Sequence, residues 1–190
     1  MKTALVLIDI QNDYFSSGKW PLLGMELAVK NAQTLLTKFR TIKEPIIHIQ
    51  HIAKAPDAPF FVRNTKGVEI HELVKPQENE NEKVVIKEFP NSFRQTTLLN
   101  DLRNFGVERL VICGGMSNMC IDATTRAAND LEFNCIVAHD ACAAKDLIFY
   151  GHITPALEVH CAFMSALSFA YAKVISTEET IGMLGIAQET

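Results

Sequence analysis

The sequence contains no long apolar segment, no basic arm and no glycine-rich GxGxxG turn. Its first apolar run, Ala4–Ile8, stops after five residues at Asp9, which is far too short for a signal sequence or a membrane span. The 18 basic residues are scattered and the net charge is -4, so nucleic acid is not expected as a partner. Without a dinucleotide fingerprint after the first strand, a nucleotide-binding oxidoreductase is disfavoured. These absences predict a protein with neither a membrane nor a nucleic-acid partner.

Cysteine pairs of the CxxC type are also lacking. The five cysteines form an odd set that makes a poor disulfide framework and suits a reducing compartment, so a cytoplasmic location is expected. Free cysteine usually behaves as a small buried hydrophobe, and most of the five should be of that kind. They are Cys113, Cys120, Cys135, Cys142 and Cys161.

Regular alternation of β-branched runs with helical patterns fills the rest of the chain. This alternation is typical of an α/β protein built on a parallel sheet, and 190 residues predict a single domain over 1–190. Strands are expected at 3–8, 46–50, 84–86, 109–113, 134–139 and 173–176. Helices are expected at 25–40, 96–105, 118–131 and 154–172, with a terminal helix after a capping box at 176–179. The proline-containing stretch 53–82 reads as a long irregular excursion.

Three polar residues fall at the carboxyl ends of predicted strands, where open parallel sheets bind their ligands. Asp9 ends the first strand, Lys87 ends the third, and Cys120 lies just beyond the fourth. Burial at a strand end is expected to raise the pKa of Asp9 and suit it for proton transfer. Helix capping explains an isolated aspartate equally well, and a lysine at a strand end is usually an exposed solubilising residue.

Cys120 has the most informative surroundings of the three. The turn Gly114-Gly115 leads from the fourth strand into a helix, whose first amides are unpaired and whose dipole favours a thiolate. The same amides can bind a tetrahedral oxyanion. The alternative is a buried structural thiol near a helix end.

Several segments of the sequence resemble the isochorismatase-like cysteine hydrolases. They are Leu5–Asp13, Lys87–Phe93, Cys113–Ile121 with Thr124–Ala128, and Ala138–Ala143, and they occur in order over nearly the whole chain. The resemblance implies a three-layer α-β-α, Rossmann-like architecture with a six-stranded parallel sheet and an Asp–Lys–Cys triad. It also implies that no cofactor takes part.

Carried over by position, the triad would consist of Asp9 as general base, Lys87 as electrostatic partner and Cys120 as nucleophile. The backbone amides of Met116 and Cys120 would bind the oxyanion, and the resemblance implies a cis peptide at Gly115–Met116. The thiolate would attack a carbonyl carbon, Asp9 would protonate the leaving amine, and water would hydrolyse the thioester. The expected reaction is cleavage of a C–N bond in a small amide, ureido or carbamoyl compound.

Two departures from related activities narrow this expectation. Isochorismatases proper lack the nucleophilic cysteine, so Cys120 argues against a vinyl-ether hydrolase. Nicotinamidases bind a metal after the second strand through an Asp-x-His pattern that is missing here. His48 and His51 could be ligands, but residues at i and i+3 of a strand face opposite sides, so no metal is expected. His139 has no assigned role.

Residues that contact the substrate are harder to identify than those of the triad. Phe15, Trp20 and Phe60 lie in predicted loops and would provide apolar walls, although packing under a loop or at a subunit interface explains them as well. Asn118 would orient the substrate or cap the helix, and Ile121 follows the proposed nucleophile.

Two further hypotheses remain from the sequence. A nicotinamidase-type or isochorismatase-type hydrolase is the nearest enzymatic alternative, and a non-catalytic binding protein on the same fold is the other. The helix expected at 154–172 is rich in alanine, serine and methionine. Such a helix would pack against a second subunit, so a homodimer or homotetramer acting on a small molecule is expected.

Overall fold

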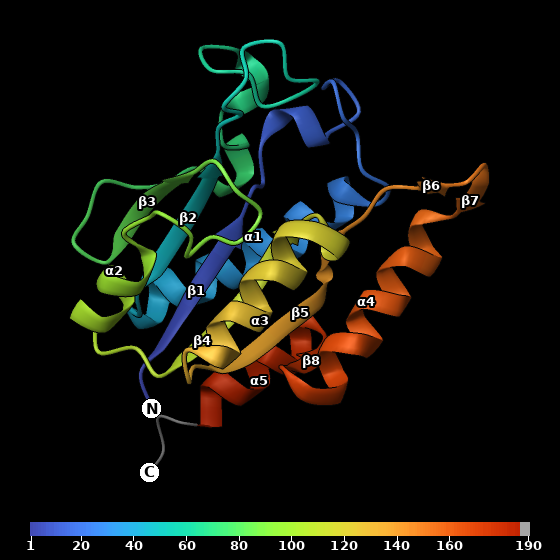
Figure 1. The fold of residues 1–190 in the computed structure, drawn as a ribbon. Coiled ribbons are helices and arrows are strands. Elements are labelled where there is room, and N and C mark those ends of the chain that lie inside the picture. The colour runs from blue at the N-terminus through green and yellow to red at the C-terminus, as the bar shows by residue number, and fades with distance from the viewer. Residues whose placement is uncertain (187–190) are drawn as a thin grey trace.

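Six parallel strands form the centre of the protein in a computed structural model that describes residues 1–186. The strand order is β3-β2-β1-β4-β5-β8, and every pairing in the sheet is parallel (Figure 1). The predicted α/β class and six-stranded parallel sheet are confirmed. The strands are β1 Thr3–Ile8, β2 Ile46–His51, β3 Glu82–Lys87, β4 Arg109–Gly115, β5 Asn134–Ala143 and β8 Lys173–Ile175.

Helices cover both faces of this sheet, which gives the three layers that were expected. The helices α1 (Met25–Ile42) and α5 (Thr177–Ile186) pack together on one face, and α3 (Asp122–Asp130) and α4 (Ala156–Ala170) pack on the other (Figure 1). The short helix α2, Leu98–Asn104, precedes β4. Because both faces are covered, every residue of β1 is buried, which explains its nearly unbroken apolar sequence.

The position of the site follows from the strand order. Strand β1 lies between β2 and β4, so the chain reverses its direction of travel across the sheet at the β1–β4 boundary. The crevice outside the carboxyl ends of strands at such a switch point is where open α/β sheets bind ligands. Asp9 and Cys120 follow these two strands.

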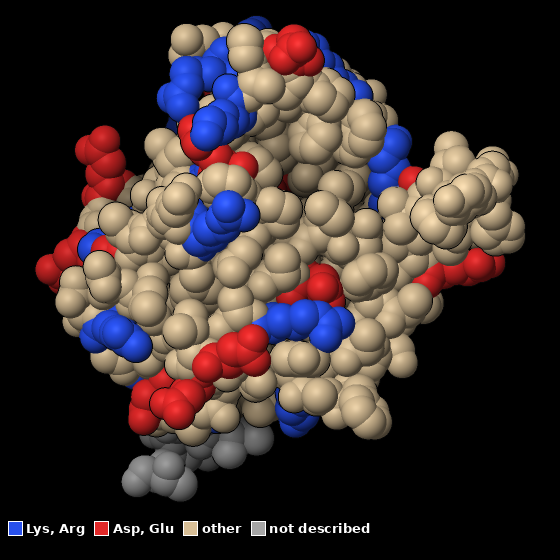
Figure 2. Space-filling model, in the orientation of Figure 1, with Lys and Arg blue, Asp and Glu red and all other residues tan. Residues whose placement is uncertain are grey.

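A β-hairpin between β5 and α4 was not predicted. It consists of β6 (Leu147–Phe149) and β7 (His152–Thr154), joined through Tyr150 and Gly151, both of which have positive φ. This arm projects from the body of the protein (Figure 1), and its exposed side chains are mostly uncharged (Figure 2). Its apolar residues gave no signal because pattern analysis assumes that apolar side chains are buried.

Helix boundaries agree with the sequence to within a few residues. The predicted capping box of α5 is confirmed, because the Glu179 amide donates to Ser176 Oγ and the Ser176 amide donates to the Glu179 carboxylate. Helix α4 begins at Ala156, two residues after the start expected at 154, and Pro155 is its N-cap. The excursion 53–82 contains the 3-10 turns η2 (Lys66–Val68) and η3 (Glu72–Val74). Among the described residues, no helix is both long and apolar enough to cross a membrane.

Candidate active site

The carboxyl ends of three neighbouring strands bring Asp9, His51 and Lys87 to one edge of the sheet. Ile8 pairs with Ile49 on one side and with Gly114 on the other, so the residues that follow β1, β2 and β4 are neighbours. His51 at the end of β2 pairs with Lys87 at the end of β3. Asp9 has a φ of 53°, which turns the chain out of the strand directly after Ile8.

A buried ion pair joins Asp9 to Lys87. Lys87 Nζ lies 2.8 Å from Asp9 Oδ2, both side chains are 0% exposed, and Nζ also donates to the Pro90 carbonyl at 2.9 Å. Asp9 Oδ1 has no hydrogen-bond partner within the described part of the chain, although it is fully buried. An oxygen of this kind is available to accept a hydrogen bond from a thiol or from a bound molecule.

Each charge of the Asp9–Lys87 pair stabilises the ionised form of the other residue. Burial raises the pKa of Asp9, but the Lys87 ammonium and then the His51 ring outweigh it, so that this pKa lies below its ordinary value. The expectation that burial would raise the pKa of Asp9 was therefore wrong. Burial lowers the pKa of Lys87, but Asp9 and then Cys120 outweigh that effect and raise it. The site thus contains a carboxylate and an ammonium ion.

Cys120 lies beside this pair in a π-helical turn, η4, which spans Ser117–Ile121 and leads into α3. Turns of this kind often occur at functional sites. The residue is 3% exposed, and burial together with the Asp9 carboxylate raises its pKa, an effect that Lys87 only partly offsets. This direction is opposite to the one that the helix dipole was expected to favour.

The chain reaches Cys120 through a glycine pair that packs closely. A Cβ atom on Gly114, whose φ is +126°, would collide with the Ile8 carbonyl, and one on Gly115 would crowd the Tyr14 ring. The cis peptide implied at Gly115–Met116 is present.

His51 completes the cluster, although the sequence gave it no role. Its Nδ1 atom lies 3.7 Å from Asp9 Oδ2 and 4.0 Å from Cys120 Sγ. Its position at the end of β2, between β1 and β3, was the available signal, but that signal depends on the strand order. His48 faces the other way, as expected for i and i+3, and its Nε2 contacts Glu82 at 3.1 Å.

Aromatic rings extend from this cluster through the 53–82 segment. Trp20 stacks on Phe60 at 4.9 Å, Phe60 contacts Phe61, and Phe61 lies 5.8 Å from His51 and 4.6 Å from Tyr14. Burial raises the pKa of Tyr14, and its ring lies against Gly115 in the turn that leads to Cys120. Trp20 and Phe60 were expected near the pocket from the sequence, whereas Tyr14 and Phe61 were not.

The other residues expected in the substrate pocket lie in different surroundings. Phe15 stacks on His71 at 3.9 Å, beside the turn η3. Ile121 is fully buried next to Cys120. Asn118 Oδ1 is buried and has no hydrogen-bond partner among the described residues.

Donor atoms for a metal ion also meet in this cluster. Asp9, His51 and Cys120 each offer one ligand atom, and these atoms lie within 4.8 Å of one another. However, the Lys87 ammonium already compensates the Asp9 carboxylate at 2.8 Å, and a cation would have to bind against that charge. His48 is turned toward Glu82, so it cannot join His51 at one metal.

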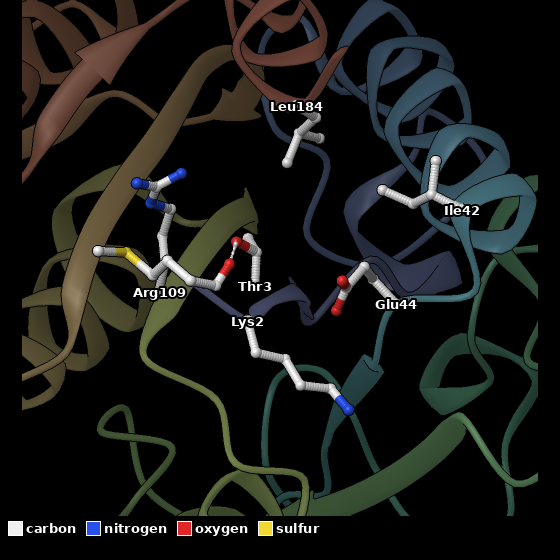
Figure 3. A pocket seen from close by; sticks show the side chains of 7 residues that line it. Lys2, Thr3, Ile42, Glu44, Arg109 and Leu184 are labelled. Carbon is white, nitrogen blue, oxygen red and sulfur yellow. Dashed lines mark hydrogen bonds between the residues drawn. The ribbon is translucent and has the colours of Figure 1, made fainter. Parts of the chain in front are cut away.

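A separate pocket lies at the opposite edge of the sheet, near the starts of β1 and β4. Figure 3 shows its lining side chains, which include Lys2, Thr3, Glu44 and Arg109. It contains no nucleophilic thiol and no buried ion pair, so it does not offer the chemistry of the Asp9–Lys87–Cys120 cluster.

The three-layer α/β fold thus brings a carboxylate, a lysine and a thiol together at its switch point, an arrangement that suits hydrolytic chemistry. Comparison with known proteins agrees, because the isochorismatase domain model matches residues 3–179. The chain belongs to the isochorismatase family of hydrolases.

Individual relatives support the same assignment. The chain is 51% identical over 178 residues to the uncharacterised isochorismatase family protein YddQ of Bacillus subtilis, covering 94% of this chain and 98% of that one. It is 34% identical over 146 residues to a streptothricin hydrolase of Streptomyces noursei, covering 76% and 50% of the two chains. The structure of a cysteine hydrolase from Pseudomonas syringae is similar with a TM-score of 0.91 at 25% identity, covering 98% and 93%.

Proposed function

We propose that this protein is a cysteine-dependent hydrolase that cleaves the C–N bond of a small amide, ureido or carbamoyl compound. The observation that carries the proposal is the buried Asp9–Lys87 ion pair, 2.8 Å long, beside the thiol of Cys120. Two opposite charges and a thiol in a site with almost no water exposure are costly to bury, and their arrangement suits proton transfer from sulfur to carboxylate.

The reaction begins with transfer of the Cys120 proton to Asp9, while the Lys87 ammonium stabilises the negative charge that forms on sulfur. The thiolate attacks the carbonyl carbon, and the amides of Met116 and Cys120 donate to the developing oxyanion. Asp9 then gives its proton to the leaving nitrogen, and the C–N bond breaks. The acyl group remains on Cys120 as a thioester, which water hydrolyses. No step uses a metal or a cofactor.

The aromatic cluster of Tyr14, Trp20, Phe60 and Phe61 favours a small substrate with an apolar or planar portion. Phe61 lies 5.8 Å from His51, so these rings adjoin the site on its His51 side. Apolar walls with a few polar groups are typical of small-molecule sites. Asn118 and Ile121 flank Cys120 in the chain and are further candidates for substrate contact. One of the relatives described above is a streptothricin hydrolase, which supports a hydrolytic reaction on a small molecule.

The proposal is tested by replacing Cys120 with alanine and measuring turnover on a panel of small amides, ureido and carbamoyl compounds. The background should carry Cys161→Ser, because Cys161 is exposed and would react first with any thiol reagent. Cys120→Ala should lose turnover by at least about 10³-fold, since the nucleophile is removed. Cys135→Ala is the matched control and should keep turnover, because this buried thiol lies in the core and donates to the Thr125 and Phe133 carbonyls. Retained turnover in Cys120→Ala would exclude the mechanism.

We further propose that the protein acts in the cytoplasm as a homodimer or homotetramer. All five cysteines are free, which suits a reducing compartment. The hairpin β6–β7 and the adjoining surface of α4 expose large apolar side chains, including Ile148, Phe149 and Leu157. Contiguous exposed apolar surface of this kind is typical of protein interfaces.

A further inference from the structure

Asp13 is a buried carboxylate that the proposed reaction leaves unused. It lies in the 3-10 turn η1, which spans Asn12–Tyr14, and is 2% exposed. In the described part of the chain, no ion pair involves this side chain. A carboxylate that is buried without a cation depends on hydrogen bonds for its stability, so its donors indicate what it holds in place.

The donors to Asp13 are backbone amides from two separate parts of the chain. The Phe61 amide donates to Oδ2 at 2.7 Å, and the Lys19 amide donates to Oδ1 at 3.2 Å. The Trp20 amide donates to the Asp13 carbonyl at 2.8 Å. The segments 10–20 and 53–82 lie side by side beyond the carboxyl ends of the strands (Figure 1). Asp13 therefore joins these two segments through both of its carboxylate oxygens.

The aromatic rings of the two segments stack on one another. Trp20 lies 4.9 Å from Phe60, and Phe60 lies 4.9 Å from Phe61. Aromatic pairs depend on the separation and tilt of their rings, so this stack requires a fixed spacing between the segments. Asp13 provides that spacing. Trp20 and Phe60 are only partly buried, so they are the part of the stack that a bound molecule can contact.

Two contacts connect the inner end of the stack to the reacting groups. Phe61 lies 5.8 Å from His51 and 4.6 Å from Tyr14. The Tyr14 ring in turn lies against Gly115, in the turn that leads to Cys120. The rings thus form one continuous wall from the surface to the site.

Gly67 packs against the same carboxylate from the 53–82 segment. A Cβ atom on Gly67 would collide with the Asp13 carboxylate. The turn η2 around Gly67 has a further anchor, because the Gln11 side chain donates to the Val68 carbonyl at 2.7 Å. A change at the carboxylate should therefore shift the aromatic contacts while the segment as a whole stays attached.

We propose that Asp13 is a positioning residue that holds Trp20 and Phe60 as one wall and thereby sets the preference of Cys120 for molecules with a planar or apolar group. The inference rests on the proposed function, because the wall affects selectivity only if Cys120 is the reacting group. Asp13 takes no part in proton transfer. Its loss should change which molecules react with Cys120 and leave the reactivity of the thiol itself unchanged.

Two thiol reagents that differ by one ring test this without a known substrate. Iodoacetamide and N-benzyl-2-iodoacetamide both form an S–C bond to a thiol and release iodide and a proton, but only the second presents a ring to the wall. The Cys161→Ser background removes the exposed thiol, and peptide mass identifies alkylation at Cys120. The measured quantity is the ratio of the two rate constants, divided by the same ratio for glutathione. Trp20 is the only tryptophan in the chain, so its emission reports on the wall separately.

Two variants alter the carboxylate from opposite segments. Asp13→Asn keeps the shape of the side chain but cannot accept from both amides, and Gly67→Ala displaces the carboxylate without changing it. The matched controls are Asp57→Asn, at an exposed position in the 53–82 segment, and Gly182→Ala, where an added Cβ atom meets nothing within 4 Å.

In both variants the corrected ratio should fall about 10-fold, because the ring of the reagent loses its contact with the wall. The rate with iodoacetamide should stay near that of the wild type, and Trp20 emission should move to longer wavelength. The controls should behave as wild type. An unchanged ratio, with or without a shift in emission, or equal slowing of both reagents would overturn the assignment. Gly67→Ala decides the matter if Asp13→Asn does not fold.

The two proposals fail in different ways. If Cys120→Ala keeps its turnover on the substrate panel, the proposed cysteine mechanism fails whatever the alkylation ratios are. If turnover depends on Cys120 and the ratio is unchanged in Asp13→Asn and Gly67→Ala, only the role of Asp13 is lost.

Discussion

Lys87 is a lysine with no exposed side-chain surface, and its charge is compensated by Asp9 alone among the acidic groups that contact it in the described residues. Removing one partner of such a pair leaves an uncompensated buried charge, which typically costs about 3–5 kcal/mol. In Asp9 that charge would be neutralised by taking up a proton, because burial would then dominate its pKa. In the proposed mechanism, Lys87 is therefore needed to keep Asp9 in its basic form.

Lys87→Met should therefore reduce turnover by at least about 10²-fold and lower the free energy of unfolding. Both are measured directly, by turnover on a substrate found in the panel and by chemical denaturation. Lys83→Met on the same strand is the matched control, because Lys83 is 41% exposed in its pair with Asp101 and such pairs contribute about 1 kcal/mol or less. Full turnover in Lys87→Met would show that Asp9 does not need the ammonium ion.

Sequence reasoning alone singled out Cys120, because its glycine turn and helix start are local features. Asp9 and Lys87 became convincing only through the family resemblance, since a lysine at a strand end is normally exposed. His51 and Tyr14 were missed because their positions beside the cluster depend on which strands are neighbours and on how closely Tyr14 approaches Gly115. Neither relation is visible in a linear sequence.

Strand β2 carries two histidines with opposite surroundings. His51 faces the cluster, whereas His48 is 1% exposed and its Nε2 contacts Glu82, which also pairs with Arg40. Burial lowers the pKa of His48 from 6.5 to about 4, and Glu82 raises it only in part. The folded protein therefore keeps His48 neutral at pH values where the unfolded chain would protonate it.

Because the unfolded chain then binds more protons, the free energy of unfolding should fall as the pH is lowered from 6.5 to about 4. The pKa shift of His48 corresponds to a loss of at most about 3 kcal/mol in the free energy of unfolding over this window. Urea denaturation at several pH values across this window should show that the free energy of unfolding falls less steeply with decreasing pH for His48→Gln than for wild type. His152→Gln, at an exposed position, should leave the slope unchanged. An identical slope in His48→Gln would exclude His48 as its source.

Most of the helices and strands could be predicted because their apolar residues repeat with the period of the element and are buried. The strand ends were less accurate: β5 was expected to end at His139 and continues to Ala143, because pairing of Gly114 and Gly115 with Cys142 and Ala143 extends it. The β6–β7 hairpin was missed for the opposite reason, since its apolar residues are exposed. Pairing partners and surface exposure are tertiary properties that periodicity does not encode.

On the surface of the whole molecule, the most prominent exposed apolar region is the arm formed by the β6–β7 hairpin. Ile148, Phe149 and Tyr150 are 72%, 75% and 95% exposed, and Leu157 on α4 is 66% exposed. Burying side chains of this size stabilises an association by about 25 cal/mol per Å² of apolar surface before the costs of binding. The arm accordingly supports the proposed homo-oligomer.

Light scattering coupled to size exclusion should give a mass that is two or four times 21.2 kDa. The double change Phe149→Ser with Tyr150→Ser should shift the protein toward the monomer, because it removes two exposed aromatic rings without touching the core. The control Val84→Ser, on edge strand β3 away from the arm, should leave the oligomeric state unchanged. A monomeric wild-type protein would exclude the proposed assembly.

The reacting groups and the aromatic walls belong to different parts of the chain. Asp9, Lys87 and Cys120 adjoin strands β1, β3 and β4, whereas Trp20 and Phe60 lie in connecting segments. Connecting segments tolerate insertions and substitutions better than the elements they join. After a gene duplication, changes confined to 53–82 would therefore give a new substrate preference while the reaction itself is inherited intact. Directed evolution of this chain should randomise that segment first.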